Sequence, residues 1–166
     1  MVQKLIIVCG IPASGKTGFV ENVLKSEYDN VVIVSRSKIR QNMYDKSEPS
    51  EYLDHEDTVK KRFYGEIKYY LKAGKTVIVD ALNTRIKARK KVIKIAKKYI
   101  DIENIVVYFL DSPLEDCILR NNRRELLCYP KVSNKVIKKC YEGLEIPTYD
   151  EGIGEIIKIK VPSWVV

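Results

Sequence analysis

The sequence predicts a three-layer α/β fold, in which helices cover both faces of a parallel sheet of about five strands. Four apolar runs, at residues 4–9, 31–34, 76–80 and 104–111, do not alternate between apolar and polar residues, which indicates strands buried on both faces. Helical segments separate these runs, and strands that alternate with helices form parallel sheets. A fifth strand is predicted at residues 155–161, where apolar and polar residues do alternate.

The helical segments complete one predicted domain over residues 1–166, because a chain of this length can bury one sizeable core. The first predicted helix runs from about Lys16 to Lys25. Three more are predicted at residues 50–74, 84–99 and 112–127. The polar stretch at residues 45–51 is predicted to be an exposed loop.

The charge balance favours an anionic partner. Thirty Lys and Arg residues against 22 Asp and Glu residues give a net charge of +8, which suits nucleotides, nucleic acid or phosphorylated metabolites. The competing explanation is a base-biased genome that encodes many Lys and Ile residues.

The same sequence favours a cytoplasmic protein with no membrane partner. No apolar stretch approaches the ~20 residues of a membrane span, and the first residues lack the layout of a signal peptide. The four cysteines form no C-x-x-C pair and have no neighbouring histidine, so we expect packed, reduced thiols rather than metal ligands. The oligomeric state stays open.

The segment "GIPASGKT", Gly10 to Thr17, carries the strongest functional signal. It satisfies the pattern G-x-x-x-x-G-K-[ST] between a predicted strand and a predicted helix, which is the context that a phosphate-binding loop requires. In such a loop, backbone N–H groups and the helix N-terminus face the phosphates, the lysine reaches the β and γ phosphates, and the final hydroxyl can ligate Mg²⁺. The pattern therefore predicts binding of ATP or another nucleoside triphosphate with Mg²⁺, through Gly10, Ala13, Ser14, Gly15, Lys16 and Thr17.

Asp80 ends a buried strand in "TVIVDALN", and the carboxyl ends of parallel strands share one edge of the sheet. Its carboxylate is therefore predicted to lie near the Mg²⁺ or near an acceptor hydroxyl. The alternative is that Asp80 caps the following helix, which Asn83 or Thr84 could cap equally well.

A predicted helix carries three arginines, Arg120, Arg123 and Arg124, at a spacing that puts them on one face. Phosphoryl transfer develops negative charge on phosphate oxygens, and arginines that close over it stabilise that charge. These residues predict a helical lid at about residues 113–130. A solvated basic face is the alternative reading.

Together these motifs resemble the polynucleotide 5′-hydroxyl kinases of the phage type and related small AAA-type P-loop kinases. The resemblance spans about residues 4–160 and also rests on "SRSKIRQNM", "VDALN", "FLDSPLEDCILRNNRR" and "KVSNKVIKKCYEGLEIPTYDEG". It implies the P-loop NTPase fold of the kinase type, with ATP and Mg²⁺ and a helical lid. It also implies transfer of the γ-phosphoryl group to a hydroxyl of a nucleic acid, foremost the 5′-OH end of DNA or RNA.

The resemblance also implies roles for individual residues. The catalytic residues would be Lys16, Arg40, Asp80, Arg120 and Arg124, with Arg40 contacting the acceptor-side phosphate or the transition state. Arg85 and Arg89 lie in the first turns of a basic helix close to Asp80, where they could reach a substrate phosphate. The candidate substrate-binding residues are thus Arg36, Ser37, Asn83, Arg85 and Arg89.

Ser37 departs from the family pattern, in which this position is usually an aspartate that acts as general base on the hydroxyl. A hydroxyl group at its ordinary pKa is a poor base. Either Asp80 takes over the contact, or the transition state is loose enough to need little deprotonation, or the acceptor differs. The alternatives are therefore a kinase for a small molecule, a modified base or aminoacyl-tRNA, and a nucleotide-binding or nucleic-acid-binding protein with weakened or no catalysis.

Overall fold

The computed structural model describes residues 2–44, 55–124 and 132–161 of the chain. The predicted loop at residues 45–51 and the end of the predicted lid, residues 125–130, lie outside these ranges, as does Cys128. No helix within the described ranges is long and apolar enough to cross a membrane.

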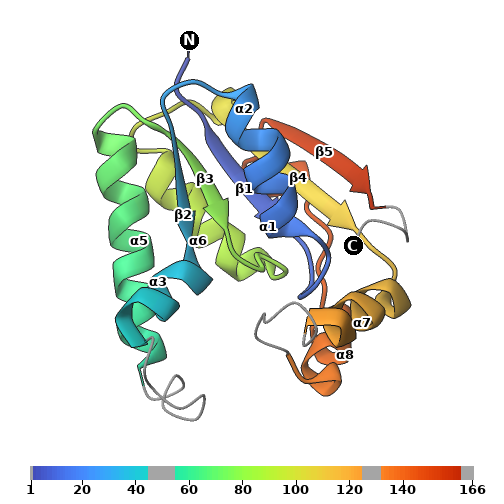
Figure 1. Cartoon of the computed structure of the whole chain (residues 1–166). Coiled ribbons are helices and arrows are strands. Elements are labelled where there is room, and N and C mark those ends of the chain that lie inside the picture. The colour runs from blue at the N-terminus through green and yellow to red at the C-terminus, as the bar shows by residue number, and fades with distance from the viewer. Residues whose placement is uncertain (1, 45–54, 125–131, 162–166) are drawn as a thin grey trace.

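Five parallel strands form one sheet in the order β2-β3-β1-β4-β5 (Figure 1). All five predicted strands are confirmed, to within two residues at each end. Their bounds are β1 Leu5–Cys9, β2 Val31–Ser35, β3 Thr76–Asp80, β4 Ile105–Asp111 and β5 Glu155–Lys160. Strands β1 and β3 are buried throughout, whereas β5, at the edge of the sheet, mixes exposed and half-buried residues and packs Ile156 and Ile157 against opposite cores.

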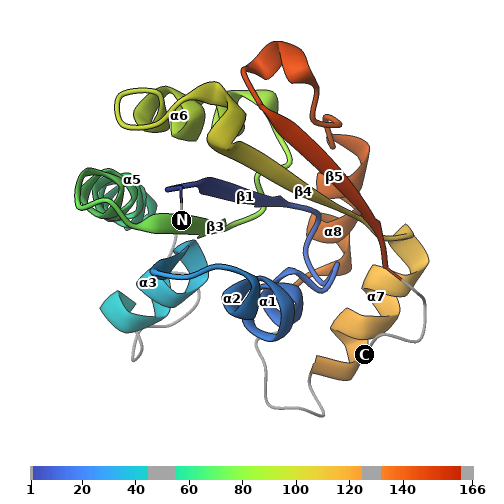
Figure 2. The same cartoon turned by 90° about the horizontal axis from the view of Figure 1, so that it is seen from above.

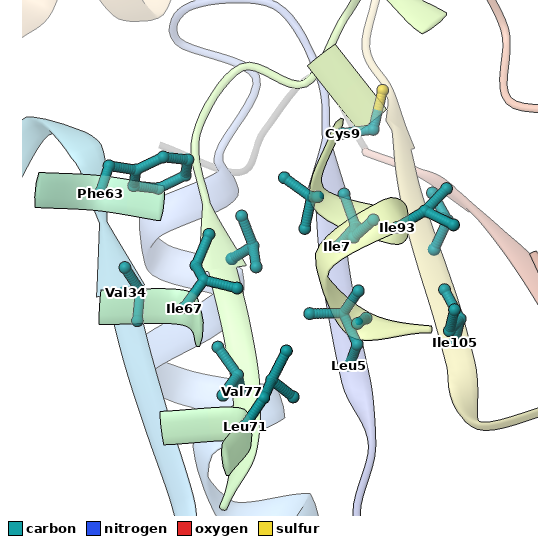
Figure 3. Close-up of a cluster of buried hydrophobic side chains, with 14 of the residues drawn as sticks. Leu5, Ile7, Cys9, Val34, Phe63, Ile67, Leu71, Val77, Ile93 and Ile105 are labelled. Atoms are coloured by element: carbon teal, nitrogen blue, oxygen red, sulfur yellow. The ribbon is translucent and has the colours of Figure 1, made fainter. Parts of the chain in front are cut away.

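Successive side chains of β1 enter two separate cores because neighbouring residues in a strand point to opposite faces. Leu5 and Ile7 join the core beneath α5 (Glu56–Lys72) and α6 (Ile86–Ala96), which Figure 3 shows. Ile6 and Val8 join the core on the opposite face. That face is covered by a continuous helical stretch whose middle is π-helical: α1 (Lys16–Phe19), η1 (Val20–Leu24) and α2 (Lys25–Glu27). Figure 2 shows the resulting three layers.

Three further helices complete the described fold at the carboxyl ends of the strands. Helix α3 (Arg36–Tyr44) begins directly after β2 and buries Ile39 in the core beneath α5. Helices α7 (Leu114–Arg123) and α8 (Asn134–Glu142) lie together beyond the strand ends (Figure 1). Short 3₁₀ turns are present at Ile102–Asn104 and Tyr149–Glu151.

The parallel topology brings the predicted site residues to one edge of the sheet. The loop from Gly10 follows β1, Arg36 follows β2 and Asp80 is the last residue of β3. Asp80 is level with Ser35 of β2 on one side and with Val8 of β1 on the other. A candidate site built from three neighbouring strand ends is therefore expected between the phosphate loop and the start of α3.

Candidate active site

The phosphate loop adopts a conformation that its glycines permit. Gly15 has φ of 92°, in the left-handed region that glycine enters without steric cost. A Cβ atom at Gly10 would lie 2.6 Å from the Ser14 Oγ atom, so a larger residue there would have to displace the Ser14 side chain. The Gly10 N–H donates to the Leu82 carbonyl at 3.0 Å, which ties the loop to the segment after β3. This cradle of backbone around the start of α1 fits a phosphate group.

Lys16 lies inside this cradle, with a relative exposure of 9%. Its Nζ atom donates to the Ile11 carbonyl at 2.7 Å and to the Ser14 hydroxyl at 3.3 Å. Burial lowers the pKa of Lys16 to about 8, while the nearby Asp80 carboxylate acts in the opposite direction. The ammonium group is thus held at the loop by contacts that phosphate oxygens could replace.

The donors that could hold Mg²⁺ are few. The Thr17 side chain, which the sequence predicts as a metal ligand, is exposed in the first turn of α1. Hydroxyl oxygens suit Mg²⁺, which in kinases takes its other ligands from substrate phosphates and water. The described part of the chain holds no cluster of three His, Cys, Asp or Glu side chains that could hold a metal ion.

Arg120 connects α7 to the phosphate loop. Its guanidinium donates to the Ala13 carbonyl at 2.8 Å and to the Ser112 hydroxyl at 2.9 Å. Ala13 has φ of 61°, so this arginine holds the backbone at an uncommon conformation. Arg124, one turn further on, is partly buried, and burial lowers the pKa of its guanidinium. Arg120 thus contacts the phosphate loop, and Arg124 lies close enough to Lys16 to lower the pKa of that lysine, whereas Arg123 is exposed.

Asp80 is hydrogen-bonded to the end of the neighbouring strand. The Ser35 hydroxyl donates to its Oδ2 atom at 3.0 Å, and the Ser37 and Ser35 hydroxyl oxygens lie 3.0 Å apart. Ser35 is 3% exposed, while Ser37 is exposed in the first turn of α3. Ser35 was not predicted as a site residue. Its only signal in the sequence is its position as the last residue of a strand beside the strand that ends in Asp80.

Arg36 and Arg40, one turn apart on α3, both bind the Glu56 carboxylate. The Arg40 guanidinium donates to both carboxylate oxygens, at 2.9 to 3.1 Å, and Arg36 forms an ion pair with the same group. Glu56 lies in the first turn of α5 and was not predicted. No local pattern marks it, because it is separated by 16 residues from Arg40 and by 20 from Arg36.

Asn83 and Arg89, both predicted to bind substrate, are buried and hydrogen-bonded within the protein. The Asn83 side chain is 6% exposed and donates to the Val8 carbonyl at 2.8 Å, so it bridges the ends of β1 and β3. Arg89 is fully buried, and its guanidinium is bound by both oxygens of the Glu151 carboxylate at 2.7 and 2.8 Å. The first turns of α6 direct Arg89 inward rather than toward a substrate.

Arg89 also supports the backbone behind the phosphate loop. It donates to the Asn83 carbonyl at 2.8 Å, and the same carbonyl accepts the Cys9 thiol at 3.2 Å. Burial raises the pKa of that thiol to about 11, so Cys9 is a packed and unreactive group, as the sequence suggests. Arg85 is exposed, and its guanidinium lies directly over Gly143 at the end of α8.

Comparison with known proteins agrees with this fold. Residues 5–145 match the AAA domain family. A chain of the Pnkp1/Rnl/Hen1 RNA repair complex shares 26% identity with a TM-score of 0.72, covering 86% of this chain and 44% of its own. This chain thus spans less than half the length of that relative.

Two solved structures with lower identity share the fold alone. Kti12 from Chaetomium thermophilum in complex with ADP-AlF3 is 19% identical with a TM-score of 0.63, covering 97% of this chain and 89% of its own. A gluconokinase from Sinorhizobium meliloti 1021 is 16% identical with a TM-score of 0.60, covering 96% and 85%. With most of its length matched, the chain belongs to the AAA domain family and has the P-loop kinase-like fold.

Proposed function

We propose that this protein is an ATP-dependent kinase that transfers the γ-phosphoryl group to a hydroxyl of a nucleic acid, foremost the 5′-OH end of DNA or RNA. One observation carries the proposal. Asp80 accepts a hydrogen bond from Ser35 at the end of β2, and its charge partly offsets the lowering of the pKa of Lys16 by burial. A carboxylate that faces both a phosphate-loop lysine and a hydroxyl-bearing strand end suits a reaction in which phosphate and acceptor meet.

On the nucleotide side, each residue has a proposed role. Lys16 would bind the β and γ phosphates, and Thr17 would hold Mg²⁺, which neutralises charge on the phosphates when it is bound. The backbone N–H groups of Gly10, Ala13, Ser14 and Gly15 would surround the phosphates. Arg120 and Arg124 would stabilise the charge that develops on the transferred group.

On the acceptor side, the proposed contacts are Arg36, Ser37, Arg40 and Arg85. Arginine forks bind carboxylate and phosphate with the same bidentate geometry, so the Glu56 carboxylate marks a place that suits an acceptor phosphate. The net charge of +8 and the similarity to a chain of an RNA repair complex also favour a polynucleotide acceptor.

A second candidate is a kinase of the same fold with a small-molecule acceptor. The ion pairs of Arg36 and Arg40 with Glu56 favour this second candidate. An acceptor that carries no phosphate does not need these two arginines, which then stay paired with Glu56.

Labelled ATP separates the two candidates. The protein is incubated with [γ-³²P]ATP and Mg²⁺ and with DNA or RNA oligonucleotides that carry either a 5′-OH or a 5′-phosphate, and in parallel with a mixture of nucleosides and sugar acids. We expect label only on the 5′-OH oligonucleotides, in a form that phosphatase removes. Equal labelling of both kinds of end, or label only in the small molecules, would contradict the proposal. The Lys16→Ala variant controls for a contaminating kinase.

A further inference from the structure

Three oxygen atoms form a hydrogen-bonded chain from the surface to the interior of the candidate site. The Ser37 Oγ atom lies 3.0 Å from the Ser35 Oγ atom, which in turn lies 3.0 Å from the Asp80 Oδ2 atom. Ser37 is exposed, whereas Ser35 and Asp80 are 3% and 5% exposed. The chain therefore connects an accessible hydroxyl to a buried carboxylate through a hydroxyl that water barely reaches.

The carboxylate fixes the direction of these hydrogen bonds. The Ser35 hydroxyl donates to the Asp80 carboxylate, so the Ser35 proton points to Asp80. The Ser35 oxygen is then the acceptor for the Ser37 proton, and the Lys38 backbone N–H approaches the same oxygen at 3.5 Å. The Ser37 proton consequently points inward, and its oxygen presents lone pairs outward. An incoming hydroxyl group would find an acceptor at Ser37, as it would at an aspartate.

We propose that Ser37 and Ser35 relay the proton of the acceptor hydroxyl to Asp80. The inference deepens the proposed kinase function and rests on it. The acceptor oxygen forms a bond to the γ-phosphorus, while the bond to the β,γ-bridging oxygen breaks and its electron pair leaves with ADP. The acceptor proton moves to the Ser37 oxygen, the Ser37 proton to the Ser35 oxygen, and the Ser35 proton to Asp80 Oδ2. Both serines end neutral, and Asp80 ends protonated.

A relay removes the difficulty that Ser37 is a poor base, because neither serine has to become an alkoxide in a stable form. The proton finally resides on a carboxylate, whose ordinary pKa is far below that of a serine hydroxyl. An aspartate at position 37 would receive the proton directly, and Ser35 would then have no part in proton transfer. The role of Ser35 should therefore depend on the residue at position 37.

A double-mutant cycle tests this dependence. Single-turnover transfer to a 5′-OH oligonucleotide and hydrolysis of ATP without an acceptor are measured for the unaltered protein, Ser35→Ala, Ser37→Asp and the combined variant. We expect Ser35→Ala to lower the rate constant about a hundredfold in the unaltered background. In the Ser37→Asp background we expect a change of less than about twofold. The exposed Ser26→Ala variant on α2 serves as the control for loss of a serine hydroxyl.

Each outcome bears on a different claim. An equal loss from Ser35→Ala in both backgrounds would show a merely structural role and overturn the relay, while transfer by the unaltered protein would still support the kinase function. Hydrolysis of ATP that follows the expected pattern, with no transfer to the oligonucleotide, would support the relay and overturn the polynucleotide acceptor. A protein that neither transfers the phosphoryl group nor hydrolyses ATP would overturn both.

Discussion

The nucleotide side and the proposed acceptor side of the candidate active site are held together by different kinds of contact. On the nucleotide side, charged side chains bind backbone carbonyls of the phosphate loop: Lys16 binds that of Ile11, and Arg120 that of Ala13. On the acceptor side, side chains bind one another across elements. Ser35 and Asp80 are separated by 45 residues, and Arg40 and Glu56 by 16.

This difference bears on how each side can change. The nucleotide side depends on the backbone path of one contiguous loop, so its geometry follows from a local motif. The acceptor side depends on pairs of side chains, and replacing one partner changes the charge presented to a substrate without altering the loop. We therefore expect variants on the two sides to affect ATP and acceptor separately.

The largest effect is expected for Lys16→Ala. The variant removes the charge proposed to bind the β and γ phosphates, and we expect transfer to fall about a thousandfold. Single-turnover assays with labelled ATP measure the loss. Lys25→Ala, at an exposed lysine of the same helical stretch, is the matched control. Retained transfer in Lys16→Ala would contradict the assignment of the phosphate site.

On the acceptor side, Asp80→Asn is expected to lower the rate constant of transfer about a hundredfold, because the amide cannot take the proton. Ser37→Ala is expected to cost less, about tenfold, since Ser37 is exposed and water can occupy its place. The same single-turnover assay compares the two variants. A larger loss from Ser37→Ala would show that Asp80 is not the final proton acceptor.

The pKa of Lys16, lowered by burial to about 8, predicts opposite pH trends for binding and stability. Above pH 8 the unbound lysine is neutral, so ATP affinity should fall up to about tenfold per pH unit. The unfolded chain keeps its proton to higher pH than the folded chain, so this group's contribution to the free energy of unfolding rises from pH 8 toward 10.5.

Calorimetry with ATP and urea unfolding between pH 7 and 10 measure these two trends. The Lys16→Met variant should lose the contribution of Lys16 to the pH dependence of ATP affinity and of the free energy of unfolding. The variant therefore separates the effect of Lys16 from that of the other lysines. Identical pH dependence in the variant and the unaltered protein would show that Lys16 is not the group that titrates in this range.

A smaller effect, confined to the nucleotide side, is expected for Arg120→Ala. Losing the contact with the Ala13 carbonyl should weaken ATP binding about fivefold. The KM for the oligonucleotide should stay constant. Arg123→Ala, an exposed arginine on the same helix, is the matched control. Equal changes in ATP affinity and oligonucleotide KM would remove the distinction between the two sides.

The smallest effect is expected for Glu56→Gln, which leaves two arginine charges unneutralised on α3. These partly exposed ion pairs are weak, so the KM for a 5′-OH oligonucleotide should fall only about threefold, with ATP affinity unchanged. Asp57→Asn, at the adjacent and almost fully exposed carboxylate, controls for the change in net charge. A rise in KM would show instead that Glu56 orients the arginines for the acceptor.

Much of the fold could be predicted from the sequence because periodicity and motif spacing are local. The five strands and the phosphate loop follow from such patterns. Helices α3 and α8 were not predicted. Helix α3 buries only Ile39, so its sequence lacks the repeating apolar stripe by which an amphipathic helix is recognised.

The candidate site was less predictable where long-range pairing decides a residue's role. Arg89 lies four residues after Arg85, and nothing local distinguishes the two. Yet Arg85 is exposed, while Arg89 is buried and paired with a glutamate that lies 62 residues away in the sequence. Ser35 and Glu56 were missed for the same reason. Their importance comes from partners on neighbouring elements, and a serine at a strand end or a glutamate at a helix start is common in sequences generally.

The Arg89–Glu151 pair has a practical consequence for how the protein should be shortened for expression. The family match ends at residue 145, which would be a natural place to cut the chain. Such a fragment would keep Arg89 in the interior without Glu151, and a buried charge that loses its partner costs about 3–5 kcal/mol. It would also expose the edge of β4 by removing β5. A fragment intended for crystallisation or assay should therefore extend past Lys160.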